Sequence, residues 1–131
     1  MGTGQLHHIE IYVSDLEMSI QFYRWFLESM GYQEFQKWES GISWKLGETY
    51  LVFVQTEEKH LDVPYHRCRT GLNHLAFHGK SKQHVVQITN ELEKRNIPIL
   101  YADKHPYAGG DDYYAVFFED PDRIKVELVA P

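Results

Sequence analysis

Two short stretches decide the fold: LHHIEI at residues 6–11 and LNHLAF at residues 72–77 share the pattern Leu-x-His-apolar-x-apolar. They are offset by 66 residues (72 minus 6), about half of the 131-residue chain, which is typical of a duplicated unit. Each stretch alternates like the start of a strand, and a helical pattern follows each one. The chain is therefore expected to contain one structural unit twice.

The helical patterns have recognisable ends. In the first half, Ser14 and Glu17 have the spacing of a capping box, and Gly31 can end the helix. The buried face of this helix is predicted to hold Met18, Phe22, Trp25 and Phe26. In the second half, Ser81 can cap a helix that ends near Asn96, with a buried stripe of Val85, Ile88 and Leu92.

Strand-like segments follow both helices, at 32–38, 41–46 and 49–55 in the first half and at 99–102, 113–119 and 124–129 in the second. The order of one strand, one helix and three strands therefore occurs twice. It predicts an α+β fold of two βαβββ modules in tandem, with curved mixed or antiparallel sheets around a cavity and helices outside. We expect a single domain over residues 1–131, with module one at about 5–58 and module two at about 70–131.

His8 and His74 occupy equivalent places in the two modules. Because side chains alternate along a strand, Ile9 and Ile11 should face the helix, which leaves His8 and Glu10 on the opposite face. A lone histidine on a strand is usually a solvated surface residue, and that alternative stays open here. The repeat nevertheless favours the interpretation that both histidines are metal ligands.

Glu127 is the one acid among apolar neighbours in the segment IKVELV at 124–129. A carboxylate there is costly to bury unless it is paired or bound to a cation, although it could also be an exposed residue of an edge strand. Two histidines and one glutamate form a set that binds Fe, Mn, Zn, Ni or Co ions and leaves positions open for water or substrate.

Other polar residues are candidates for proton transfer. Glu10 should share the face of His8 and could accept a substrate proton, or it could support a ligand or simply be solvated. The interval between His74 and Glu127 is 53 residues, and the interval between His8 and Val52 is 44, so the second module has nine extra residues. We expect them to fall in the segment 103–114. This segment could be a lid or substrate wall with His105 and Tyr113 as proton-transfer partners, or an ordinary loop.

Composition excludes several classes of function. The net charge is −6 and no block of Lys or Arg is present, so neither nucleic acid nor an anionic membrane is an expected partner. The longest apolar runs are too short to span a bilayer. With a single cysteine, Cys68, and no signal-peptide pattern, the simple expectation is a cytoplasmic protein.

The chain also resembles the vicinal oxygen chelate superfamily, which includes glyoxalase I, fosfomycin-resistance enzymes, extradiol dioxygenases and bleomycin-resistance proteins. The resemblance rests on His8 seven residues before Asp15-Leu16, on Ser19-Ile20-x-Phe22-Tyr23, on Asn73-His74-Leu75-Ala76-Phe77, and on Phe118-x-Asp120-Pro121-Asp122 running into Val126-Glu127-Leu128. It implies His8, His74 and Glu127 as the metal positions. His7 is less favoured, because His8 has the ligand spacing.

The chain departs from that pattern at two places. Val52 aligns with Glu127, where glyoxalase I has a second glutamate ligand, so the resemblance implies a three-ligand site similar to that of fosfomycin-resistance enzymes and extradiol dioxygenases. Arg123 stands where many relatives have Gly.

Two functions remain in view. The first is a metal-dependent enzyme that acts on a small molecule through two metal-bound oxygens, by lyase, isomerase, addition or ring-cleavage chemistry. The alternative is a metal-free small-molecule binding protein of the bleomycin-resistance type. A homodimer is expected in either case, because open sheet edges are commonly covered in this way.

Overall fold

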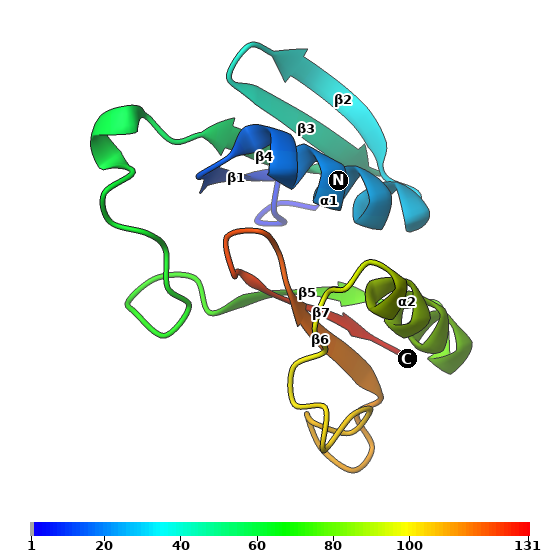
Figure 1. The fold of residues 1–131 in the computed structure, drawn as a ribbon. Helices are drawn as coiled ribbons and strands as arrows, with labels where there is room; N and C mark the ends of the chain where they lie inside the picture. Colours follow the sequence, from blue (N-terminus) through cyan, green and yellow to red (C-terminus); the bar gives the residue numbers. More distant parts are fainter. Residues whose placement is uncertain (1) are drawn as a thin grey trace. The chain divides into compact units, whose positions relative to one another are not determined.

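The computed structural model describes residues 2–131 and divides into two compact units, Met1–Pro64 (unit 1) and Tyr65–Pro131 (unit 2). Among the residues described, no helix is both long enough and apolar enough to cross a bilayer. Each unit has its own sheet and its own helix (Figure 1). The predicted α+β class is confirmed.

Unit 1 is a four-stranded mixed sheet covered by one helix. Its elements are β1 (His8–Val13), α1 (Leu16–Ser29), β2 (Gln33–Trp38), β3 (Gly41–Leu46), β4 (Thr49–Gln55) and the short 3-10 helix η1 (Glu58–His60). The strand order is β1-β4-β3-β2, in which β1 runs parallel to β4 and the other neighbours are antiparallel. The strands predicted for this half are confirmed to within one residue.

Unit 2 repeats this plan with one strand fewer. Its elements are β5 (His74–His78), α2 (Lys82–Lys94), β6 (Ala115–Glu119) and β7 (Lys125–Val129). The strand order is β5-β7-β6, with β5 parallel and β6 antiparallel to β7. The strand predicted at 99–102 is wrong: only an isolated bridge joins Ile99 to Phe118, because Tyr101 has a φ of 55°, which turns the chain out of the extended conformation.

Helix α1 begins one residue later than its sequence pattern suggests. The cap is Asp15 and not Ser14: a carboxylate oxygen of Asp15 accepts a hydrogen bond from the Met18 N–H at 3.3 Å. Gln55 at the end of β4 accepts from the Leu16 N–H and donates to the Ser14 carbonyl, both at 2.8 Å. These bonds satisfy backbone groups that the first helical turn leaves unpaired.

The helices bury one apolar stripe each. In α1, Phe22 and Phe26 are buried as predicted, whereas Met18 is 54% exposed and Tyr23 takes a place in the core instead. Helix α2 is capped by Ser81, whose hydroxyl accepts from the His84 N–H, and its predicted stripe of Val85, Ile88 and Leu92 is buried. Contacts place α1 against β3 and β4, and α2 against β6.

Candidate functional site

Glu127 is a buried acid at the centre of the unit 2 sheet. It lies on β7, the middle strand, between Ala76 of β5 and Phe117 of β6, and only 2% of it is exposed. The alternative of an exposed residue on an edge strand is therefore wrong. A carboxylate in such a place needs a partner that compensates its charge.

His74 is one such partner. Its Nε2 lies 3.2 Å from Glu127 Oε1, and its Nδ1 lies 2.7 Å from the side-chain oxygen of Asn73. Because an amide oxygen only accepts hydrogen bonds, Nδ1 must donate, and Nε2 of a neutral ring then directs a lone pair at the carboxylate. That contact is favourable only with a proton on Nε2 or with a cation held by both atoms.

Tyr113 is the second partner of Glu127. Its hydroxyl donates to Glu127 Oε2, from the end of the 103–114 segment that precedes β6. The hydrogen bond to Glu127, then burial and the carboxylate charge, raise the pKa of Tyr113 to about 12. The phenol therefore remains a hydrogen-bond donor at neutral pH and holds one oxygen of the carboxylate.

This arrangement fits a divalent metal in part. An imidazole nitrogen and a carboxylate oxygen are suitable donors, and Asn73 orients His74 through its other nitrogen, as is usual for metal-binding histidines. Among the described residues of either unit taken alone, no three His, Cys, Asp or Glu side chains are placed to hold a metal ion. Unit 2 thus brings together two of the three residues that were predicted as ligands.

The third predicted ligand, His8, lies on β1 of unit 1. Its ring stacks on that of Tyr50, with centroids 4.8 Å apart and planes 4° apart. Its Nδ1 is 2.9 Å from Nδ1 of His7, so one of these two nitrogens donates to the other. Within residues 2–131 the Nε2 atom of His8 has no hydrogen-bond partner, which leaves it available to a ligand.

The two units carry their carboxylates on different strands. The parallel ladders pair His8 with Tyr50 and Glu10 with Val52 in unit 1, and His74 with Lys125 and Ala76 with Glu127 in unit 2. This register supports the alignment of Val52 with Glu127. Glu10, which is exposed, lies on the strand beside Val52, so unit 1 does present a carboxylate at this level of its sheet.

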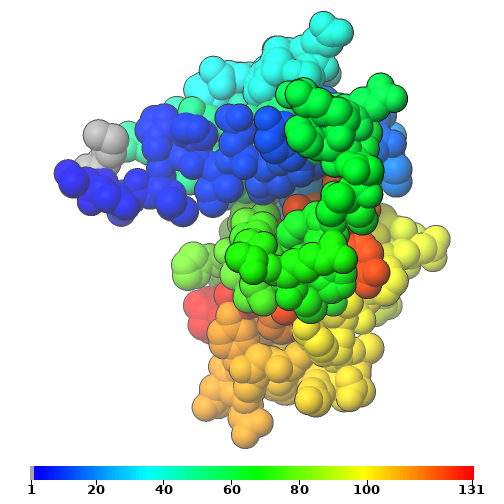
Figure 2. All heavy atoms as spheres, turned by 90° about the vertical axis from the view of Figure 1, so that its left-hand side faces the viewer, coloured from blue at the N-terminus to red at the C-terminus, as the bar shows by residue number. Residues whose placement is uncertain are grey.

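The 103–114 segment lies at the surface of unit 2, in colours from yellow to orange in Figure 2. Of the two residues predicted from it, Tyr113 reaches Glu127, whereas His105 lies within electrostatic reach of Glu93 on α2. Burial lowers the pKa of His105, and the carboxylate of Glu93 acts in the opposite direction. The structure therefore joins only one of these two residues to the buried acid.

Sequence reasoning missed two residues that lie close in the chain to His74 and Glu127. Asn73 orients His74, and its position directly before that histidine was the available signal. Lys125 shares the face of Glu127 because it precedes it by two residues on β7, and strand alternation alone could have identified it.

Comparisons with known proteins agree with this fold. The model of the Glyoxalase/Bleomycin resistance protein/Dioxygenase superfamily matches residues 5–128. The uncharacterized protein YqjT of Bacillus subtilis (strain 168) is 63% identical over 126 residues, which cover 96% of this chain and 98% of that protein.

Solved structures extend the comparison. A Bacillus halodurans protein, described provisionally as a glyoxalase, is 56% identical with a TM-score of 0.97, over 98% of this chain and 97% of that one. The lactoylglutathione lyase of Agrobacterium tumefaciens is 21% identical with a TM-score of 0.68, over 99% and 96% of the two chains, which is a likeness of fold alone.

Proposed function

Because the chain belongs to the glyoxalase/bleomycin resistance protein/dioxygenase superfamily, we propose that it is a divalent-metal-dependent enzyme acting on a small molecule through two neighbouring oxygens. The ligands in this proposal are His8, His74 and Glu127. One observation carries it: Nε2 of His74, whose Nδ1 faces the Asn73 side-chain oxygen, lies 3.2 Å from the buried carboxylate of Glu127. A cation held by these residues would offset the cost of burying Glu127.

The proposed donor set of two nitrogens and one carboxylate suits Fe, Mn, Zn, Ni or Co. When bound, such an ion supplies Lewis-acid chemistry to substrate oxygens. The reaction class, whether lyase, isomerase, addition or ring cleavage, would follow from substrate screening of the loaded protein.

The chain's own residues would divide the remaining work. Glu10 is exposed and shares its strand face with His8, so it is the proposed acceptor of a substrate proton. Tyr113 is a positioning residue, because its hydroxyl acts on Glu127 and fixes the direction of that carboxylate. No proton-transfer role is proposed for His105, since its charged neighbour is Glu93 of α2.

A metal-free binding protein is the second candidate. An aromatic cluster in unit 1 favours this second candidate. The ring centroid of Tyr50 lies 4.8 Å from that of His8 and 5.1 Å from that of Phe35, and Phe35 is 45% exposed. Such rings can hold a planar ligand without turnover.

Metal binding separates the two candidates. We would measure metal content by elemental mass spectrometry and affinity by calorimetry, on the parent and on His8→Ala, His74→Ala and Glu127→Gln. Loss of a protein ligand should weaken binding by at least about tenfold, because the loss of an outer-shell partner alone typically costs about 10–100-fold in metal affinity. His78→Ala is the matched control, because His78 lies on the same strand and face as His74 but is exposed.

The enzyme proposal requires near-stoichiometric metal in the parent and in His78→Ala, and much less in the three ligand variants. A parent protein that takes up no metal after reconstitution would contradict the enzyme proposal. The metal-free binding protein would then be the remaining candidate. Equal metal in the parent and in Glu127→Gln would overturn the proposed ligand set.

A further inference from the structure

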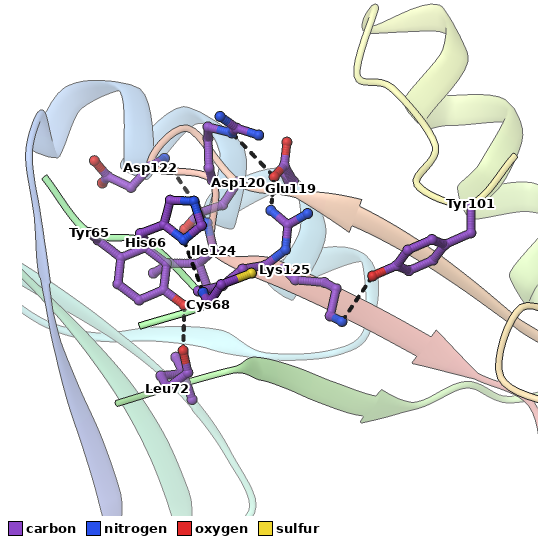
Figure 3. A network of polar contacts seen from close by, with 12 residues as sticks. Tyr65, His66, Cys68, Leu72, Tyr101, Glu119, Asp120, Asp122, Ile124 and Lys125 are labelled. Atoms are coloured by element: carbon purple, nitrogen blue, oxygen red, sulfur yellow. Dashed lines mark hydrogen bonds and ion pairs between the residues drawn. The ribbon is translucent and has the colours of Figure 1, made fainter. Parts of the chain in front are cut away.

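Lys125 is the charged side chain nearest in sequence to Glu127 on the same sheet face. It lies on the middle strand β7, where residues two apart point to the same side. Its side chain is partly buried, in contrast to most strand lysines, which extend into solvent. Figure 3 shows it directed toward Tyr101, which comes from the segment before β6.

Two aromatic rings hold the ammonium group close to the level of Glu127. The Nζ atom lies 3.2 Å from the Tyr101 hydroxyl, 5.5 Å from the Tyr101 ring centroid and 5.9 Å from that of Phe117. The two rings meet edge to face at 5.6 Å. Phe117 is also the ladder partner of Glu127, so one ring lies next to both the ammonium group and the strand position of the buried acid.

Across residues 2–131, no acidic oxygen lies within 4.0 Å of Lys125 Nζ. Its ladder partner on β6, Glu119, contacts the guanidinium groups of Arg67 and Arg123 instead. The acid that could have paired with Lys125 is therefore already taken by two cations.

The surroundings of Lys125 suit an anion. The ammonium donates to the Tyr101 oxygen, so the Tyr101 proton is available to a further acceptor, and two donors can converge on one ligand atom. Tyr101 is 44% exposed, so an anion from solvent can reach this pair of donors.

We propose that Lys125, with Tyr101 and Phe117, forms an anion subsite that binds a carboxylate or similar anionic group of the substrate. This inference rests on the proposed function for the identity of the ligand as a substrate. Strand positions two apart are separated by roughly 6.6 Å. The proposed substrate class is therefore a small organic acid whose anionic group lies a few bonds away from its two metal-bound oxygens.

The test uses metal-stripped full-length protein, so that metal binding does not contribute. Phenylacetate is the anionic probe, and phenylacetamide is its neutral isostere of the same shape. NMR titration should show shifts at the amides of Tyr101, Phe117 and Lys125 with phenylacetate and none with phenylacetamide. Added NaCl should weaken the binding, because the contact is electrostatic.

Three variants locate the interaction. Lys125→Met should bind phenylacetate about tenfold more weakly, equivalent to about 1.4 kcal/mol, whereas Lys125→Arg should stay within about threefold of the parent because it retains a cationic donor. Tyr101→Phe keeps the ring and removes one donor, so it should weaken binding by several-fold. Lys82→Met is the matched control, because Lys82 Nζ also lies near an aromatic ring of the same unit, 5.5 Å from the ring centroid of Tyr114. The Lys82→Met variant should bind phenylacetate as tightly as the parent.

The outcomes separate the subsite from the metal site. Equal binding of phenylacetate by the parent and by Lys125→Met and Tyr101→Phe, or equal binding of phenylacetamide, overturns the subsite whatever the metal content. Phenylacetate binding that depends on Lys125, in a protein that takes up no metal, supports the subsite and overturns only the proposed enzyme. A Lys125→Met protein that fails to fold leaves Tyr101→Phe and Lys125→Arg to decide.

Discussion

At the scale of single residues, the chemistry of the unit 2 sheet follows from one buried acid. Each oxygen of Glu127 has its own partner, the His74 ring at 3.2 Å on one side and the Tyr113 hydroxyl on the other. Removal of the Tyr113 hydroxyl leaves a desolvated oxygen of Glu127 without its donor, which costs more than the hydrogen bond itself contributes. The stability of the metal-stripped protein should therefore report on this pair.

Tyr113→Phe tests the second contact. We expect the free energy of unfolding of the metal-stripped protein to fall by about 1 kcal/mol, because Glu127 Oε2 loses its donor. Urea titration at neutral pH measures it. Tyr107→Phe is the control from the same segment, because Tyr107 is 45% exposed and Tyr113 is 38% exposed. The free energy of unfolding of this variant should fall by less than about 0.5 kcal/mol. An equal loss in both variants would contradict the assigned contact.

At the scale of secondary-structure elements, the start of α2 combines a cap with a titrating group. Ser81 accepts from the His84 N–H, and the Lys80 N–H donates to His84 Nδ1 at 3.0 Å. Burial, and then the charge of Lys80, lower the pKa of His84 below its ordinary value of 6.5. The neutral imidazole of His84 is the form that can accept the Lys80 N–H at the start of this helix.

The pH dependence of stability follows from that shift. Between the lowered pKa and 6.5, the unfolded chain binds more protons at His84 than the folded chain. The contribution of His84 is therefore complete above pH 6.5 and is lost as the pH falls through the lowered value. In urea titrations between about pH 7 and pH 5, the stability of His84→Gln should fall less than that of the parent.

Lys80→Met separates the two causes of the His84 shift. It removes the charge and keeps the burial, so its loss of stability on acidification should lie between those of the parent and His84→Gln. Parallel pH profiles for all three proteins would contradict the role given to His84.

At the scale of the whole molecule, both sheets end in open strands. In unit 1 the edge strand β2 is exposed along its whole length and carries Phe35 and Trp38, which are 45% and 43% exposed. Open edges with apolar side chains favour association of like copies. We therefore retain the homodimer as a proposal.

Sedimentation equilibrium over a dilution series tests the dimer. We expect a mass of twice 15.5 kDa, which is 31 kDa, at micromolar concentration, because each copy brings open edges to be covered. A single species of 15.5 kDa at every concentration would contradict association.

Features that depend on near neighbours in the chain could be predicted from the sequence alone. The repeat at 6–11 and 72–77, the Ser81 cap and the buried stripe of α2 could all be predicted, because helical and strand periodicity and caps are local properties. The same alternation placed His8 and His74 on the polar faces of their strands, and the motifs indicated the family. Glu127 was recognisable as an acid in an apolar strand.

Only the tertiary structure decided what depends on residues far apart in the chain. Asp15 caps α1 and Ser14 does not, and Gln55, 41 residues after Ser14, binds the backbone around that cap. Tyr113 was one candidate among several until the fold brought its hydroxyl to Glu127, 14 residues away. The contact of Glu119 with Arg67, which occupies the acid opposite Lys125, likewise spans 52 residues. Such contacts follow from how strands and loops pack, and no local pattern encodes them.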